Sequence, residues 1–551
     1  MRLKIILGFF TIVFFLVIAK LFYLQILNPH VTENDPYLKT RKILPQRGKV
    51  YDVLGQPLAV NTTNYLLFFE PKKISDKYLF TKKVEDILKV GEATIEAKIN
   101  QDKDWVAFKI VDKETKTKLE ATQLTGIGFD NKSQRYYPEA SLSAHILGIV
   151  GKDTQGEDIG YFGIEGYYDK DLAGLPGLLK SERDLLDKPI LIGTQEKIDS
   201  EDGRDLYLTI DKSVQEIAKK KLLNGLETYQ SKEGCVIVAD PYTMAITALS
   251  CLPDFDLDKY YEFSEKYFKN SAISDLYEPG SIFKPLIVAA ALEEKKIKPE
   301  DIYDEEGPIK IGEYTIRTWD NKYEGKISMT RILEKSSNVG MVHIGEKLGD
   351  KKVYEYVKKF GFGEVTGIDL QGEVGGYLKS LSSWYPIDYA TVTFGQGIVV
   401  TPIQILTAFA SIINDGKLLK PYIVARAESK DQKNVAQPQV VRKIVSEKTS
   451  ATIKKMLVDT VEHGEVSWAK PKGYKIGGKT GTAQIAISGK YDASKTIASF
   501  VGFAPADKPK FIILVVLKEP KSSIWGSETA APLFFDIAKE LLVYYNIPPE
   551  E

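Results

Sequence analysis

The sequence predicts an α+β protein in three parts: an N-terminal transmembrane helix, an elongated mixed domain, and an antiparallel sheet with a helical insertion. Three observations predict this. A long apolar run opens the chain, and a hairpin pattern at residues 235–250 starts a sheet. The strand patterns that complete the sheet return only at 476–483, 496–501 and 511–517, after a largely helical stretch from 330 to 453. A sheet that opens early and is completed late is an α+β arrangement.

Composition excludes several classes of function. The chain has 551 residues, with 74 basic and 75 acidic side chains interspersed, and that length corresponds to about three or four domains. No basic patch or aromatic–basic ladder indicates nucleic acid. The four histidines and two cysteines are not clustered at metal-ligand spacing. We therefore expect no metal, no cofactor and no nucleic-acid partner.

The amino terminus carries a targeting signal. Arg2 and Lys4 precede an apolar run at residues 5–19, which continues after one lysine through residues 21–27. Together these form about 23 residues, roughly 34 Å as a helix, which spans a bilayer. A cleaved signal peptide is the alternative, but no small-x-small cleavage site follows. Because the positive charges precede the span, we expect residues 1–27 to be an uncleaved single-pass anchor in the cytoplasmic membrane, with the rest of the chain outside.

Residues 28–201 form a polar, mixed region. The segment 47–59 predicts two short strands around a glycine turn, 82–103 predicts a charged helix, and 148–151 and 163–168 predict strand or turn elements punctuated by glycine. The region contains no candidate nucleophile, metal cluster or phosphate loop. We therefore interpret it as a scaffold domain.

The second half begins with a strand at 203–211 and a helix capped by Asp211 or Ser213. The hairpin that follows has Cys235 and Cys251 at the outer ends of its two strands. A cross-strand disulfide requires Cα atoms within about 6.8 Å, and two buried thiols packing as small apolar groups are the alternative. The sequence leaves both open.

Ser281 is the first candidate nucleophile. It follows the Pro279–Gly280 turn and precedes an Ala-rich apolar run at 286–292 that predicts a buried helix. Lys284 then lies three residues along, on the same face. A serine hydroxyl needs a base, and an amine can serve when burial or a second cation lowers its pKa from about 10.4. By itself the Ser-x-x-Lys pattern is expected by chance about two or three times in such a chain, so a capping serine is the simpler reading.

Two further clusters change that reading. Ser336-Ser337-Asn338 follows a helical pattern, and Lys479-Thr480-Gly481 lies on a predicted strand. All three clusters in this order are far rarer than any one of them. The combination is already associated with class A β-lactamases and penicillin-binding proteins.

The three clusters form a coherent catalytic set. We expect Ser281 to attack a carbonyl while Lys284 takes its proton, and Ser336 to relay a proton to the leaving amine. Asn338 would hold Lys284 and a substrate amide. Lys479 would keep Lys284 neutral and attract a carboxylate.

The last motif would also bind substrate. We expect Thr480 to hydrogen-bond the carboxylate and Gly481 to let the strand lie close to the ligand. The backbone N–H groups of Ser281 and Thr482 would form the oxyanion hole. The candidates for a Ser-His triad are His343 and His463. Neither has a carboxylate at a sequence spacing that indicates a triad, and we interpret both as structural.

With these motifs, the chain resembles a class B penicillin-binding protein, a membrane-anchored peptidoglycan D,D-transpeptidase. The resemblance covers nearly the whole chain and includes residues 47–59, 135–138, 163–165, 172–174, 208–215, 394–397, 401–404 and 530–532. It implies an anchor at 1–27, a pedestal or dimerisation-like domain at 28–201, and a serine β-lactamase/transpeptidase-like domain at 202–551.

The resemblance also implies the reaction and the partners. The substrate would be a peptidoglycan stem peptide ending in D-Ala-D-Ala. Ser281 would be acylated with release of D-Ala, an amine of a neighbouring stem would take the acyl group, and β-lactams would acylate the same serine. A lipid-linked glycan-strand polymerase of the shape, elongation or division type would be the partner at the anchor and pedestal.

Four other functions remain open. A serine β-lactamase or a penicillin sensor uses the same chemistry, although the pedestal and the lack of a Glu-x-x-x-Asn motif between Asn338 and Lys479 argue against a β-lactamase. A D-Ala-D-Ala carboxypeptidase would use water as acceptor. A non-catalytic cell-wall scaffold would not need Ser281, Lys284 and Lys479 together.

Overall fold

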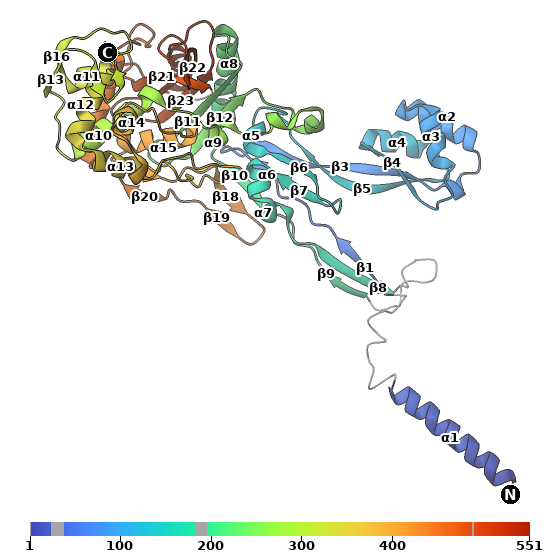
Figure 1. Cartoon of the computed structure of the whole chain (residues 1–551). Helices are drawn as coiled ribbons and strands as arrows, with labels where there is room; N and C mark the ends of the chain where they lie inside the picture. Colours follow the sequence, from blue (N-terminus) through green and yellow to red (C-terminus); the bar gives the residue numbers. More distant parts are fainter. Residues whose placement is uncertain (1, 24–37, 183–194, 488–489, 551) are drawn as a thin grey trace. The chain divides into compact units, whose positions relative to one another are not determined.

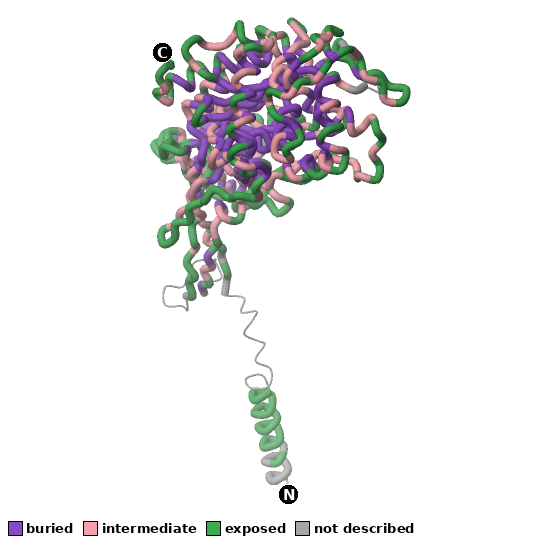
Figure 2. The backbone as a smooth tube through the Cα atoms, turned by 90° about the vertical axis from the view of Figure 1, so that its left-hand side faces the viewer, coloured by how far each residue is buried: buried purple, intermediate pink, exposed green. Residues whose placement is uncertain are grey.

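The computed structural model describes residues 2–23, 38–182, 195–487 and 490–550 (Figure 1). The chain divides into two compact units. One is formed by Met1–Arg47 with Ala173–Gly203, and the other by Gly48–Leu172 with Arg204–Glu551. The domain limits at residues 27 and 201 stay predictions. Figure 2 shows that buried residues gather in the second unit.

The first unit contains helix α1 (Arg2–Phe22) and a three-stranded antiparallel sheet in the order β1-β8-β9. These strands cover Leu38–Ile43, Gly177–Glu182 and Gln195–Ile198. In the part of the chain that the structure describes, no helix has both the length and the apolar character needed to cross a membrane. The end of the predicted anchor, residues 24–27, lies outside the described residues.

In the second unit, strands of both predicted domains share one sheet. Its order is β19-β18-β10-β2-β3-β4, and β5 pairs with β3. The strands are β2 (Val50–Tyr51), β3 (Pro57–Phe69), β4 (Val106–Val111), β5 (Ile127–Tyr136), β10 (Asp205–Leu208), β18 (Val424–Glu428) and β19 (Lys433–Val435). The predicted strands at 47–59 are confirmed as β2 and the start of β3. Because β2 runs parallel to β10, with Val50 opposite Leu206, backbone hydrogen bonds join the pedestal segment to the second half.

Three helices pack against β3, β4 and β5 around a small core that contains Leu67, Phe69, Phe80 and Ile95. They are α2 (Lys77–Leu88), α3 (Glu92–Ile99) and α4 (Lys113–Ala121). The prediction of one charged helix at 82–103 is wrong. Lys89 adopts a left-handed conformation with φ 52° and ends α2, so the segment folds as two helices that share the core.

Short elements follow β5: α5 (Ala144–Leu147), β6 (Ile149–Lys152), β7 (Asp158–Tyr161), α6 (Gly163–Tyr167) and α7 (Asp169–Ala173). The strand expected at 148–151 is confirmed as β6. The strand or turn expected at 163–168 is instead a short helix. Its turn buries Ile164 and Glu165 completely, and the Glu165 carboxylate accepts a hydrogen bond from Arg135.

The central sheet of the second half is antiparallel, in the order β12-β11-β23-β22-β21. Its strands are β11 (Glu233–Ala239), β12 (Ile246–Leu252), β21 (Gly477–Ile487), β22 (Lys490–Ala504) and β23 (Phe511–Lys518). β11 pairs with β23 although more than two hundred residues separate them, with Ile237 opposite Leu514. The predicted sheet, opened early and completed late, is confirmed.

The two faces of this sheet belong to different cores because successive side chains of a strand point to opposite faces. Val236 and Val238 pack with α8 (Lys212–Thr228) and α17 (Ala530–Tyr544). Ile237 and Ala239 lie in the larger core with the helical insertion. Asp211 is the cap of α8, since its carboxylate accepts from the N–H groups of Ser213 and Val214.

The insertion between β12 and β21 contains the helices α9 (Ser271–Ser274), α10 (Lys284–Glu293), α11 (Met329–Glu334), α12 (Asn338–Leu348), α13 (Asp350–Lys359), α14 (Pro386–Val392), α15 (Pro402–Ile413) and α16 (Glu447–His463). It also carries the short strands β13 (Ile302–Glu305), β14 (Ile309–Ile311), β15 (Tyr314–Ile316), β16 (Gly325–Ser328), β17 (Lys417–Leu419) and β20 (Val440–Lys443). The largely helical prediction for 330–453 therefore missed β17 to β20, which pair outside the helical layer.

The hairpin resolves the two cysteine alternatives. Cys235 of β11 and Cys251 of β12 stand opposite each other and are joined by a disulfide bond. Both residues are buried. The structure therefore contains the cross-strand bridge and not two free thiols.

Candidate active site

Ser281 lies in a single 3₁₀ turn, Gly280–Phe283, that leads directly into α10. Gly280 has φ +59°, and its N–H donates a 3.0 Å hydrogen bond to the carbonyl of Gly395. A Cβ at Gly395 would lie 2.2 Å from the Gly280 carbonyl oxygen, so both positions require glycine. Two separated segments thus hold the turn that presents Ser281.

Lys284 is the first residue of α10 and is completely buried. Its Nζ lies 2.6 Å from the carbonyl oxygen of Ser336, 3.1 Å from Ser336 Oγ and 2.9 Å from Asn338 Oδ1. Burial, with the nearby Lys479 ammonium as second cause, holds the pKa of Lys284 well below its usual range. A neutral amine in this place can accept a proton.

Ser336 and Asn338 flank the start of α12. Ser336 has a left-handed backbone with φ 58°, and Ser337 caps the helix by accepting from the N–H of Gly340. The Nδ2 group of Asn338 donates a hydrogen bond to the carbonyl of Arg317. Since its Oδ1 accepts from Lys284, the Asn338 amide orientation is set from both sides.

Lys479 lies on β21 and only 2% of its surface is exposed. Its Nζ donates to Thr480 Oγ1 over 3.0 Å. Burial lowers the pKa of Lys479 to about 8, although the nearby Glu465 carboxylate opposes that shift. Lys479 is therefore mostly protonated at neutral pH, and a second cation next to Lys284 is the arrangement that keeps that amine neutral.

Gly481 and Thr482 are positioned by close packing. A Cβ at Gly481 would lie 2.4 Å from Ser499 Oγ and 3.1 Å from the Pro279 carbonyl oxygen. Glycine is therefore needed here for β21 to contact the turn before Ser281, a reason that differs from the expected close approach of a ligand. Thr482 Oγ1 accepts from the N–H of Gly526 over 2.9 Å.

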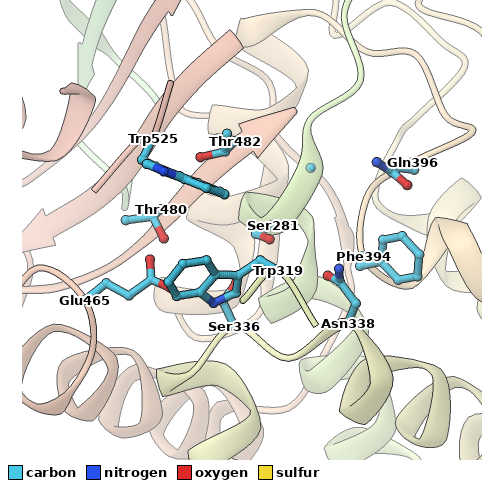
Figure 3. A pocket seen from close by; sticks show the side chains of 11 residues that line it. Ser281, Trp319, Ser336, Asn338, Phe394, Gln396, Glu465, Thr480, Thr482 and Trp525 are labelled. Atoms are coloured by element: carbon cyan, nitrogen blue, oxygen red, sulfur yellow. The ribbon is translucent and has the colours of Figure 1, made fainter. Parts of the chain in front are cut away.

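These segments form the walls of one cavity that is open to solvent. It is lined by Gly280, Ser281, Trp319, Ser336, Asn338, Phe394, Gln396, Glu465, Thr480, Thr482 and Trp525 (Figure 3). Ser281, Ser336, Asn338, Thr480 and Thr482 are thus brought to one cavity, as expected. Lys284 lies buried against Ser336 and Asn338, and Lys479 against Thr480.

Six lining residues were not among the predicted site residues, namely Gly280, in the turn that presents Ser281, and five residues from other segments. Trp319 and Trp525 meet edge to face with ring centroids 5.2 Å apart, and no local pattern marks either one. Phe394 and Gln396 belong to a segment that carried the family resemblance, which was the one signal available for them. Glu465 follows α16 without any motif.

The two histidines do not line this cavity. His343 stacks on Tyr303, with ring centroids 4.2 Å apart, and His463 Nδ1 lies 3.6 Å from Glu334 Oε1. Among the described residues, no group of three or more His, Cys, Asp or Glu side chains could hold a metal ion.

The family model for the penicillin binding protein transpeptidase domain matches residues 234–539, more than half of the chain. The chain belongs to this family. A second family model, for the penicillin-binding protein dimerisation domain, matches residues 42–208. The two domains together confirm the resemblance to a class B penicillin-binding protein, and with it a serine-type transpeptidase.

Individual relatives of this penicillin-binding protein agree. It is 34% identical to stage V sporulation protein D of Bacillus subtilis, over 100% of this chain and 86% of the relative. It is 31% identical to a peptidoglycan D,D-transpeptidase FtsI homolog of Mesostigma viride, over 97% and 94% of the two chains. The solved structure of a peptidoglycan synthetase from Bifidobacterium adolescentis matches with a TM-score of 0.75 and 26% identity, covering 93% of this chain and 98% of that one.

Proposed function

We propose that the chain is a peptidoglycan D,D-transpeptidase that cross-links stem peptides through an acyl ester on Ser281. The observation that carries the proposal is the buried Lys284 amine beside Ser336 and Asn338, three residues from a serine that opens onto the cavity. The name of the Mesostigma viride relative, a peptidoglycan D,D-transpeptidase FtsI homolog, supports the substrate class.

In the first half-reaction, Ser281 Oγ attacks the carbonyl between the two terminal D-Ala residues, and its proton passes to the neutral Lys284 amine. The N–H groups of Ser281 and Thr482 stabilise the oxyanion. The ester bond forms, the C–N bond breaks, and a proton delivered through Ser336 Oγ leaves with the terminal D-Ala.

The terminal carboxylate of the donor would bind Thr480 and the Lys479 ammonium. In the second half-reaction, an amine of a neighbouring stem attacks the ester and loses its proton, and Ser281 leaves as its hydroxyl. The products are a new peptide bond and free enzyme. Water as acceptor instead of the amine would make the enzyme a carboxypeptidase.

A fluorescent penicillin tests the acyl-enzyme. Its ring carbonyl should acylate Ser281 of the full chain in detergent, and the label should survive denaturing electrophoresis for many minutes and be absent in Ser281→Ala. Incubation with a D-Ala-D-Ala stem pentapeptide should release D-Ala and, with an acceptor stem, yield a cross-linked dimer. Rapid turnover of penicillin in large excess over enzyme would instead identify a β-lactamase. A correctly folded protein that takes no label would be a scaffold.

We further propose that residues 1–27 anchor the chain in the cytoplasmic membrane beside a lipid-linked glycan-strand polymerase. Support comes from Arg2 and Lys4 ahead of the apolar run, and from the exposed apolar side chains of α1, such as Phe10, Phe14 and Leu16. Amino-terminal sequencing of membrane-extracted protein should begin at or near Met1. A sequence that begins near Asn28 would contradict the anchor. The polymerase should co-purify with the full chain from membranes and be lost when residues 1–27 are removed.

A further inference from the structure

A carboxylate lies at one end of the cavity. Glu465, just after α16, lines the cavity of Ser281 together with Thr480 and Trp319 (Figure 3). Glu465 also lines a second, smaller hollow, together with Lys479 and Thr480. The residue therefore borders both the cavity of Ser281 and the space next to the buried Lys479.

The charge of Glu465 acts on both lysines without a direct ion pair. Among the described residues, no Lys, Arg or His nitrogen lies within 4.0 Å of its carboxylate. Even so, its field raises the pKa values of Lys284 and Lys479, against the lowering that burial causes. Burial raises the pKa of Glu465 in turn, and Lys479 and Lys284 oppose that rise. The three groups share one low-dielectric region.

We propose that Glu465 is a specificity-determining residue that weakens the binding of anionic ligand groups at the Lys479–Thr480 end of the cleft. This inference rests on the proposed function, which assigns that end to the carboxylate of the donor peptide. A fixed negative charge beside a carboxylate site offsets part of the attraction of the cation. The Lys479 ammonium then attracts the incoming donor less strongly, and it releases the anionic leaving residue more readily.

The reaction gives this weakening a role. After acylation the amino acid leaving group still carries its carboxylate, and the acceptor amine must enter where it lay. A site that held the anion at full strength would slow that exchange. Glu465 does not itself take part in the proton path from Ser281 through Lys284 to Ser336. Its effect on the pKa of Lys284 is the same for every ligand, whereas its effect on a bound anion depends on the ligand.

A matched pair of ligands isolates the effect. We would measure second-order acylation rate constants at pH 6 for a penicillin with a free carboxylate and for its methyl ester. This pH lies far enough below the pKa of Lys479, about 8, that Lys479 stays charged even when the loss of Glu465 lowers its pKa. In Glu465→Gln, the acid-to-ester ratio of the rate constants should rise roughly tenfold, because one negative charge near the ligand anion is removed. Removal of Glu465 also lowers the pKa of the base Lys284, but that change acts on both ligands alike and cancels in the ratio.

Two variants serve as controls. Glu465→Asp keeps the charge and should resemble wild type with both ligands. Glu462→Gln removes a negative charge from α16, where Glu462 pairs with Lys470 and does not line the cavity, and should also leave the ratio unchanged. Since both ligands are compared on one preparation, a partly folded variant does not alter the ratio.

The experiment distinguishes failure of the Glu465 proposal from failure of the proposed function. An equal change for acid and ester, or no change for either, would overturn the role of Glu465 while leaving Ser281 acylation intact. Wild-type protein that neither ligand acylates would instead overturn the proposed function itself.

Discussion

The second unit contains two buried clusters of ionisable side chains. One pairs opposite charges and is structural, whereas the other brings two lysines together and is reactive. In the pedestal segment, Arg135 donates to the carboxylate of Glu165 at 2.7 Å and to the Gly48 carbonyl and Asn61 Oδ1 at 2.7 and 3.0 Å. These opposite charges are both nearly excluded from solvent, with 5% and 0% of the side chains exposed. A buried pair of opposite charges that also hydrogen-bonds the surrounding segments holds those segments together.

In the cleft, the two buried groups carry the same potential charge. The Lys479 ammonium lies close enough to disfavour a charge on Lys284, and Glu465 offsets this only in part. The unfavourable burial appears as lowered pKa values, most strongly at Lys284. We conclude that charge pairing in the pedestal supports the fold, and that the incomplete pairing in the cleft supports acid–base chemistry.

The largest expected effect comes from replacing Lys284, the base of the reactive cluster. Lys284→Arg replaces the neutral amine by a permanent cation and so removes the base, because guanidinium does not release its proton near neutral pH. We expect penicillin acylation to fall by roughly 10³- to 10⁴-fold, the range of general base catalysis. The measurement is the second-order rate constant of labelling. Lys479→Arg is the matched control and should retain far more activity, since its role is electrostatic. Equal rates in Lys284→Arg and wild type would remove Lys284 from the role of base.

A smaller effect is expected when the structural pair Arg135–Glu165 is broken. Glu165→Gln leaves the buried guanidinium of Arg135 without its counter-charge, and we expect a loss of about 3–5 kcal/mol in the free energy of unfolding. Asp158→Asn, which breaks the half-exposed pair with Lys152, should lose less than about 1 kcal/mol. Urea unfolding measures both.

The acylation rate per folded molecule should be unchanged in Glu165→Gln, because no charge of the cleft is altered. A stable Glu165→Gln protein with slow acylation would contradict the division between a structural and a reactive cluster.

The smallest expected effect is on the pH dependence of the acylation rate. Acylation needs neutral Lys284 and protonated Lys479, so the rate should rise with pH as Lys284 loses its proton and fall above about 8 as Lys479 loses its own. At pH 9, one unit above that pKa, about one tenth of Lys479 stays charged, and the rate for a carboxylate penicillin should be about tenfold below its limit.

Lys479→Arg moves the descending limb to higher pH, because an arginine stays charged. The profile is measured by fluorescent penicillin labelling from pH 6 to pH 10. A descending limb that is identical in wild type and Lys479→Arg would assign it to another group.

Local sequence patterns predicted much of this protein. The alternation at 235–250, the Ala-rich run after Ser281 and the capping residue Asp211 depend on neighbours within a few positions, and all were found as expected. The sequence alone identifies the motif residues Ser281, Ser336, Asn338 and Thr480, because each has a recognisable chemistry at a recognisable spacing. All four line the same cavity. The glycine-turn strands at 47–59 were readable for the same reason.

Tertiary structure alone decided the rest. No local pattern indicates that β11 pairs with β23, or that β2 joins β10 in a sheet that crosses the predicted boundary at 201. Such pairings depend on side-chain packing between distant segments and on the entropy of closing long loops. Glu465 has no motif, and its charge matters only because folding places it beside Lys479 in a region of low dielectric. Residue type determined what each group can do, whereas burial and neighbouring charge, which exist only in the folded chain, decided its protonation and its strength.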